Sequence, residues 1–391
     1  MSELLESRWQ ETKGALLEGL TGNKKSVMAA TLENTRKYLS ESATAGATSA
    51  GNVATLNRVI LPVIRRVMPT VIANELVGVQ PMTGPVGQIH TLRVRYSDTT
   101  TGGAENTTAG EEALSPFKIA EAYSGNDGDP AKGAATASLE GTAGNRLSIQ
   151  ILKQTVEAKT RKLSARWTFE AAQDAQAQHG VDVEAEIMAA LAQEITAEID
   201  QEILASLGNL ASTYETYDQA AVSGTATFVG DEHAALAVQI NRVANLIAQR
   251  TRRGAGNWAV VSPFALTLLQ SATTSAFART TEGTFEAPTN TKMVGTLNNA
   301  MRVYVNTYAA DNSPVLVGYK GTSESDAAAF YCPYIPLMSS GVVLDPSTFE
   351  PVVSFMTRYG YVELSNTASS LGNAADYLGK VAISSGNVSF S

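Results

Sequence analysis

The chain has little cysteine and little histidine, and it lacks long apolar runs. Cys332 is the one cysteine, so no intrachain disulfide can form, which is typical of a reducing compartment. No apolar run reaches the roughly 18 residues that indicate a transmembrane helix. The three histidines, His90, His179 and His233, do not stand with Cys332 or a serine in a recognisable catalytic order. We therefore expect a cytoplasmic, non-membrane protein without a catalytic site.

Motifs for nucleotides and nucleic acids are also missing. No GxxxxGK[ST] sequence occurs, and Gly254-Ala255-Gly256 lacks the third glycine of a dinucleotide fingerprint and follows a helical pattern. The 29 lysines and arginines against 38 acids give a net charge of −9, which does not favour nucleic-acid binding. The sequence predicts no bound cofactor and no metal.

The clearest element is a long acidic helix expected over 182–207. Aliphatic residues recur every four positions and predict a buried stripe: Val183, Ile187, Leu191, Ile195, Ile199, Ile203 and Leu207. Asp182 is a good N-cap, and Gly208-Asn209 is expected to end the helix. Seven acids and no base accompany the stripe: Asp182, Glu184, Glu186, Glu194, Glu198, Asp200 and Glu202. They indicate a solvated acidic face. Acid–base catalysis or a metal site is disfavoured because no histidine or second carboxylate motif is near.

Two segments, one before and one after residues 97–145, predict a long two-stranded ribbon. Residues 89–96 alternate apolar and polar side chains, and residues 147–169 do so with phase changes that imply bulges or bends. Between them, residues 97–145 contain few large apolar residues, so we expect an extended loop without a core. The ribbon is basic, with Arg93, Arg95, Arg146, Lys153, Lys159, Arg161, Lys162 and Arg166.

The remaining chain predicts a mixed α/β lobe and terminal extensions. A helix over 232–253 ends in Arg250, Arg252 and Arg253, which fit cations before a glycine cap better than an anion site. Strands and a short helix are expected between 259 and 333, and two strands over 342–363. A strand-like stretch over 381–390 could add to a neighbour's sheet. Residues 1–50 predict two helices and a small-residue linker, followed by an arm kinked at Pro62 and Pro69.

Four ordered blocks of sequence resemble one known family. They are Arg65, Arg66, Met68 and Pro69 with Gly78–Met82 and Gly84-Pro85; residues 156–204; residues 249–262; and residues 317–361, with VGYKG, FYCPYIPLM and FMTRYGY. Together they resemble the major capsid protein of T-even-type tailed phages. Relatives carry an inserted domain in the region of 97–145, and here this segment is too short and too poor in apolar residues for one.

The resemblance implies an α+β, HK97-like capsid fold in five parts. These are an N-terminal arm (1–87), an E-loop ribbon (88–168), a P-domain whose first part holds the spine helix (169–224), an A-domain (225–336), and the second P-domain part with the tail (337–391). In that fold the E-loop reaches over a neighbouring subunit. The resemblance therefore suggests that ribbon cations and spine acids pair between subunits, with these candidates: Arg65, Arg66, Arg93, Arg95, Lys153, Arg161, Lys162, Arg166, Glu194, Glu198 and Glu202.

The implied function is structural. We expect a homo-oligomer of hexamers, with pentamers of the same chain left open, that closes an icosahedral head around double-stranded DNA without sequence-specific binding. Portal, scaffold and decoration proteins are the implied partners. Two alternatives share the fold: the paralogous pentameric vertex protein and an encapsulin-type compartment. Leu39-Ser40-Glu41 before Ser42 fits a family-type processing signal, and Leu16-Leu17-Glu18 before Gly19 fits too. Such short patterns arise easily by chance, so we expect a retained arm, with propeptide removal at Glu41-Ser42 as the alternative.

Overall fold

The computed structural model describes residues 9, 13–14, 17, 25–34, 72–100, 106–111, 113, 123–125, 133–141, 143–179, 183–222, 229–251, 253–272, 277–279, 292–323, 326–348, 350–364 and 374–384. Helices and strands are both present, which confirms the predicted α+β class. The chain divides into two compact units. Unit 1 is Met1–Gly87, Val156–Ser206 and Phe330–Val362; unit 2 is Gln88–Thr155, Leu207–Ala329 and Glu363–Ser391. The five-part division stays a prediction.

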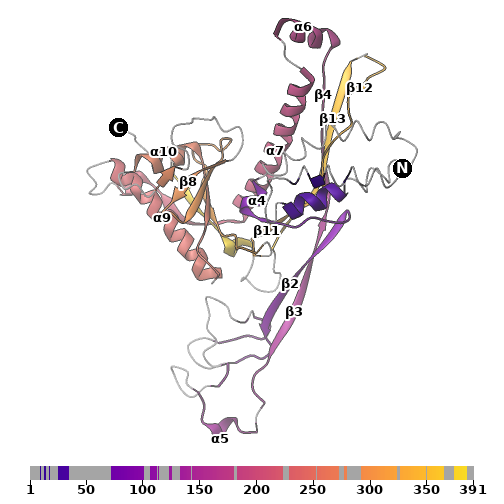
Figure 1. Cartoon of the computed structure of the whole chain (residues 1–391). Helices are drawn as coiled ribbons and strands as arrows, with labels where there is room; N and C mark the ends of the chain where they lie inside the picture. Colours follow the sequence, from indigo (N-terminus) through magenta and orange to yellow (C-terminus); the bar gives the residue numbers. More distant parts are fainter. Residues whose placement is uncertain are drawn as a thin grey trace. The chain divides into compact units, whose positions relative to one another are not determined.

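Unit 1 joins a sheet to the long spine helix, α7. Its strands run in the order β1-β11-β13-β12, and β4 also pairs with β13. The β1–β11 pair is parallel, whereas β4 and β13 are antiparallel from Arg166↔Val352 to Lys159↔Tyr359. Figure 1 shows α7 running beside β4 and β13. The elements are α4 (Ala73–Leu76), β1 (Gly78–Val79), β4 (Lys159–Arg166), α6 (Phe169–His179), α7 (Val183–Leu210), β11 (Ala329–Ser339), β12 (Val343–Leu344) and β13 (Pro351–Glu363).

The four-residue stripe of α7 is buried from Leu191 onward, as its spacing predicts, whereas Val183 and Ile187 in the first turns are half-buried. Ile195, Ile199 and Ile203 are each at most 2% exposed, and Leu207 is fully buried. The expected stop at Gly208 is wrong, because the helix continues to Leu210. A glycine within a helix costs only about 1 kcal/mol, and Ala211 N–H still donates to the Leu207 carbonyl at 3.0 Å. Burial of Leu207 outweighs the glycine. The expected cap, Asp182, lies outside the described residues.

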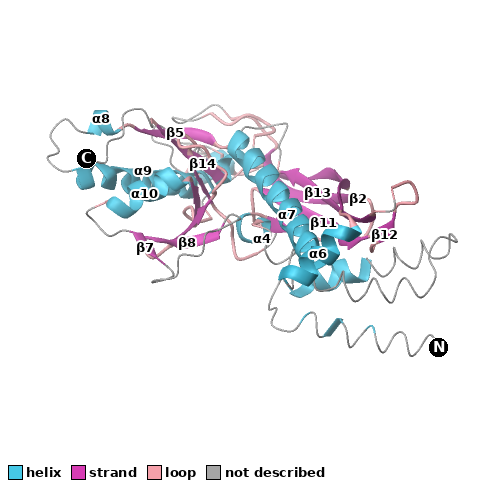
Figure 2. Cartoon of the chain, turned by 90° about the horizontal axis from the view of Figure 1, so that it is seen from above, coloured by secondary structure: helices cyan, strands magenta, loops and turns pink. Residues whose placement is uncertain are grey.

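Unit 2 is built on a seven-stranded sheet of order β5-β14-β10-β6-β9-β8-β7. Helix α9 packs on β5, β14 and β10 and against α10, and Figure 2 shows both helices beside this sheet. Four apolar residues of α9 at helical spacing, Leu236, Ile240, Val243 and Ile247, are all fully buried. The elements are β5 (Ser212–Tyr217), α8 (Gln219–Val222), α9 (Val229–Thr251), β6 (Trp258–Val261), α10 (Pro263–Ser271), β7 (Phe277–Arg279), β8 (Lys292–Leu297), β9 (Met301–Val305), β10 (Val315–Gly318), the 3-10 helix η1 (Ala374–Tyr377) and β14 (Leu378–Ile383).

The C-terminal strand differs from its expected place. It forms at Leu378–Ile383 and lies between β5 and β10 of its own chain, parallel to β5 and antiparallel to β10. Leu378 and Val381 are fully buried. This strand is therefore an inner member of the sheet, and the described part of the tail does not add to a neighbour's sheet.

The ribbon forms as predicted, from β2 (Val86–Tyr96) and β3 (Leu147–Glu157), with the short helix α5 (Thr136–Leu139) in the connection. The two strands pair with each other and run side by side in Figure 1. The bend predicted within 147–169 lies at Ala158, where β3 ends at Glu157 and β4 begins at Lys159 and joins the sheet of unit 1.

The expectation of a coreless connection at 97–145 is wrong for the residues that the structure describes there. Tyr123 is 9% exposed and packs on Tyr96 with ring centroids 4.5 Å apart. Ala113 N–H donates to the Val94 carbonyl, and Gly110 N–H to the Tyr96 carbonyl, both at 2.8 Å. The connection thus folds back along β2. Two tyrosines and backbone hydrogen bonds make this small core, which a count of aliphatic residues does not reveal.

Candidate assembly surfaces

Arg161 on β4 is the centre of a hydrogen-bonded network that includes several of the site residues that the sequence suggested. Its Nη1 donates to Glu198 Oε2 and its Nη2 to Glu202 Oε2, each at 2.6 Å. Its Nε donates to the hydroxyl of Tyr359 on β13, also at 2.6 Å, and that hydroxyl donates to Glu202. The planar guanidinium fork spans the two carboxylates, which one helical turn separates on α7.

This network holds Glu202 in its charged form. Burial raises the pKa of Glu202, but hydrogen bonds from Arg161 and Tyr359 outweigh burial and leave its pKa below the ordinary value. Burial and the neighbouring Glu202 raise the pKa of Tyr359, so its hydroxyl stays protonated. The sequence suggested that these charges pair between subunits. The structure joins Arg161, Glu198 and Glu202 within one chain.

The other candidates stand apart from this network. Lys153, Lys162 and Glu194 are exposed. Arg166 is 3.8 Å from Glu350, with a side chain that is 68% exposed. Arg95 is buried at 8% exposure. Arg93 lies on β2, but its side chain is not described, and Arg65, Arg66, Glu41 and Ser42 lie outside the described residues.

The ribbon carries an exposed aliphatic row. Leu147, Ile149 and Ile151 alternate along β3 and are 54%, 69% and 65% exposed. Leu92 on β2 is 65% exposed. Aliphatic side chains at such exposure on neighbouring strands are typical of a surface that another molecule covers. A second aliphatic group lies at the tip of unit 1, where Val342, Val343 and Leu344 are all exposed.

Asp200 is a site residue that sequence reasoning missed. It was counted among the solvated acids, yet it is 1% exposed. Its Oδ1 accepts the Ile72 N–H at 2.9 Å. A signal was available: Ala192, Thr196, Asp200 and Leu204 form a second row at four-residue spacing beside the aliphatic stripe, and all four are buried.

The arginines at the end of α9 are occupied by acids and tyrosines. Arg250 lies over the Tyr214 ring at 4.3 Å and is 3.9 Å from Asp376. Arg253 Nη1 donates to Asp326 Oδ1 at 2.7 Å. Arg252 lies outside the described residues. These contacts agree with the preferred interpretation of cations at a helix end rather than an anion site.

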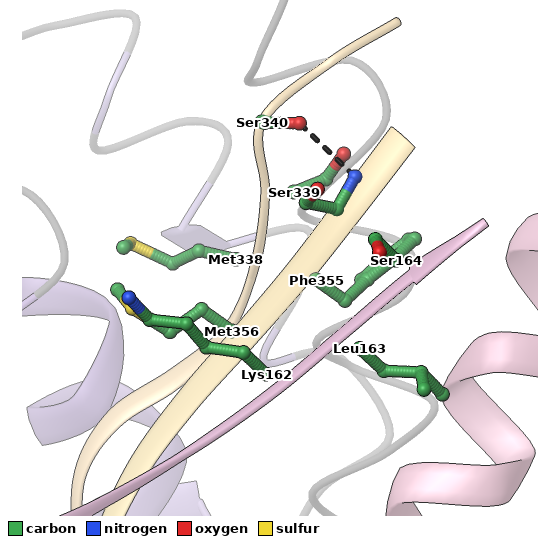
Figure 3. A pocket seen from close by; sticks show the side chains of 9 residues that line it. Lys162, Leu163, Ser164, Met338, Ser339, Ser340, Phe355 and Met356 are labelled. Carbon is green, nitrogen blue, oxygen red and sulfur yellow. Dashed lines mark hydrogen bonds between the residues drawn. The ribbon is translucent and has the colours of Figure 1, made fainter. Parts of the chain in front are cut away.

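An open hollow of about 480 Å³ lies on the sheet of unit 1. Figure 3 shows Lys162, Met338 and Met356 pointing to one side of it, and a hydrogen bond of 3.1 Å from Ser354 N–H to Ser340 Oγ. Lys162 is the one titratable side chain of its lining, so the hollow has no acid–base pair. Within the described ranges, no group of three His, Cys, Asp or Glu residues could hold a metal.

Comparison with known proteins decides the family. The model of the major capsid protein Gp23 matches residues 53–383. The chain belongs to the Gp23 family of phage major capsid proteins. It is 31% identical to the major capsid protein of Vibrio phage KVP40, over 84% of this chain and 80% of that one. It is 30% identical to the major capsid protein of Enterobacteria phage T4, over 83% and 78%.

The Gp23 match confirms the resemblance drawn from the four sequence blocks, and a major capsid protein builds the shell of the phage head. The KVP40 alignment spans 417 positions, more than the 391 residues here, so that relative has residues which this chain lacks. The solved structure of Microbacterium phage Oxtober96 matches 80% of this chain and 90% of its own with a TM-score of 0.47 and 12% identity. The capsid of Myoviridae phage XM1 matches 76% and 90% with 0.44 and 13%. Among the described helices, none is long and apolar enough to cross a membrane.

Proposed function

We propose that this capsid protein assembles into hexamers, with its ribbon laid over a neighbouring subunit, and that it has no catalytic role. The observation that carries the proposal is the exposed aliphatic row Leu147, Ile149 and Ile151 on β3. A protein that worked as a monomer would expose this row to water. A second copy of the chain would cover it.

The energetic argument rests on burial. Full burial of a leucine or isoleucine side chain contributes about 1.5–3 kcal/mol. Three half-exposed side chains therefore offer several kcal/mol for each subunit contact, before the cost of association. In a closed shell every contact recurs by symmetry, so each subunit would gain this burial at every copy of the contact, which favours assembly.

The charged candidates would set register in the same contact. Because Arg161 is bonded within its own chain, the exposed Lys153, Lys162 and Glu194 are better placed to pair with a neighbour. Exposed ion pairs contribute about 0–1 kcal/mol each, so their effect would be on alignment more than on affinity.

A matched pair of variants tests the ribbon contact. We expect Ile149→Ser with Ile151→Ser to prevent assembly, because the change removes aliphatic area from the row. Gln150→Ser changes the exposed residue between them on the opposite face of β3 and is expected to assemble normally. Negative-stain electron microscopy and sedimentation of the full chain provide the readout. Shells of normal yield from the double variant would contradict the proposal.

The same images separate the alternatives. Hexameric sheets, tubes or closed shells support the hexamer proposal, whereas pentamers alone would indicate the vertex paralogue. A co-purified enzyme inside the shells would indicate a compartment. We propose portal, scaffold and decoration proteins as partners, and DNA as contents held without sequence-specific contacts. Glu41-Ser42 is the candidate processing site, and the intact mass of chains from mature particles tests whether it is cut.

A further inference from the structure

A carboxyl group lies inside unit 1 at the place where the N-terminal arm meets the spine helix. Asp200 is 1% exposed. Its Oδ1 accepts the backbone N–H of Ile72 at 2.9 Å, and its Oδ2 has no hydrogen-bond partner among the described residues. A buried carboxylate stays charged where it accepts two to three hydrogen bonds. Asp200 accepts one, so its surroundings favour the neutral acid over the anion.

Ile72, whose N–H Asp200 accepts, lies in residues 72–82 of the N-terminal arm, which form a docked segment. Leu76, Val77, Val79 and Met82 of this segment are all buried. The segment is also held by β11: Gln80 N–H donates to the Tyr331 carbonyl and Met82 N–H to the Pro333 carbonyl, both at 3.0 Å. The bond to Asp200 thus fixes one end of the segment, and the bonds to β11 fix the other.

Among the described residues, the elements that hold Asp200 and its neighbours Ile72 and Tyr331 carry no positive charge. Helices α4 and α7 and strands β1 and β11 contain no lysine, arginine or histidine. Their titratable groups are Glu75 on α4, Tyr331, Cys332 and Tyr334 on β11, and the remaining acids of α7. Tyr331 interacts electrostatically with Asp200, and burial raises the pKa of that tyrosine, so it is neutral. Arg161, from β4, is occupied by Glu198, Glu202 and Tyr359.

We propose that Asp200 is a proton-controlled latch, which keeps residues 72–82 docked on the spine helix while its carboxyl is neutral and loosens them when it ionises. Loss of the proton would leave a buried anion with one hydrogen bond and no cation on the described elements beside it. Undocking of the arm segment would let water reach the carboxylate. The latch is a property of a single chain, so it stands or fails independently of hexamer formation.

The sign of the pH dependence follows from burial. Burial raises the pKa of Asp200 to about 7, and the hydrogen bond from Ile72 lowers it only in part. In the undocked segment the carboxyl returns toward its ordinary value of 3.8. The docked state therefore binds a proton between these values that the undocked state does not. The undocking equilibrium should rise about tenfold per pH unit in this range and level off above it.

Amide hydrogen exchange of the full chain tests the latch. Opening of the peptide covering residues 72–82 is measured from pH 5 to 9, after correction for the intrinsic exchange rate at each pH. We expect opening in the wild type to rise with pH and to level off above about pH 7. Asp200→Asn keeps the acceptor for Ile72 N–H without a charge, so its opening should not change with pH. Glu194→Gln removes an exposed acid of the same helix and should follow the wild type.

Three results would overturn the proposal: a wild-type profile that is flat with pH, an Asp200→Asn profile that follows the wild type, or a change with pH that runs in parallel in the sheet of unit 2. If that variant does not fold, the wild-type profile decides alone. The latch is supported if opening of peptide 72–82 levels off near pH 7 while opening of the sheet of unit 2 does not change with pH. A parallel rise of opening in both units would refute it.

Discussion

Replacement of Arg161 by methionine tests whether the network between β4, β13 and α7 stabilises unit 1. Methionine keeps most of the aliphatic stem and removes the guanidinium. Each carboxylate contact contributes about 0–1 kcal/mol, because Glu198 and Glu202 are 45% and 36% exposed. The hydrogen bond to Tyr359 has a charged donor and adds about 1.5 kcal/mol or more. We therefore expect Arg161→Met to lower the free energy of unfolding by about 2–3 kcal/mol.

Urea unfolding of the unassembled chain, followed by tryptophan fluorescence, measures this loss. Arg166→Met is the matched control, because it also removes an arginine from β4, where the partner Glu350 is 3.8 Å away; its effect should stay within about 0.5 kcal/mol. A double-mutant cycle with Glu202→Gln should give a coupling energy of about 1 kcal/mol. Equal losses for Arg161→Met and Arg166→Met, or zero coupling, would refute the reasoning.

Three further predictions concern packing and protonation. Gly360→Ala should lower the thermal midpoint by an amount equivalent to about 1–3 kcal/mol, because a Cβ there would collide with Val156. Gly208→Ala has open space within α7 and should raise stability by about 0.5–1 kcal/mol. A higher thermal midpoint for Gly360→Ala than for Gly208→Ala would contradict both. Burial raises the pKa of Cys332 to about 11, so a thiol reagent at pH 8 should label it only after unfolding, and rapid labelling of the native chain would show the burial to be wrong. The stabilisation from Glu202 should be complete above its ordinary pKa of 4.5 and be lost as pH falls through its lower folded value, which an acid titration of wild type against Glu202→Gln will show.

Periodic features of this protein could be predicted from the sequence. The four-residue spacing of Ile195, Ile199 and Ile203 identified the buried side of α7, and the alternation in β2 identified the ribbon. Such patterns are read within one element, because they depend only on the geometry of a helix or a strand. The same reasoning placed the end of α7 wrongly, since a weak local stop at Gly208 competes with the burial of Leu207 by the rest of the fold.

Contacts between distant segments could not be predicted in this way. The pairing of Arg161 with Glu198 and Glu202 joins β4 to α7, and a list of basic and acidic residues fits pairing within a chain as well as pairing between chains. The same holds for the tip of the ribbon, where Tyr96 and Tyr123 meet across a connection of low hydrophobicity. Family resemblance supplied the function without supplying these contacts.

Asp200 and Glu202 show why charge counting fails on the spine helix. Two positions apart on an α-helix, side chains point in directions about 200° apart, so these carboxyls meet different surroundings. Glu202 turns toward the Arg161 guanidinium, and its pKa falls. Asp200 turns toward Ile72 and elements without a cation, and burial raises its pKa. As pH rises above 4.5, the first acid already contributes its full stabilisation, while the second becomes steadily more unfavourable up to about pH 7. An acidic helix that looks uniform in sequence thus contains one group that fastens the sheet at neutral pH and one that loosens the arm there.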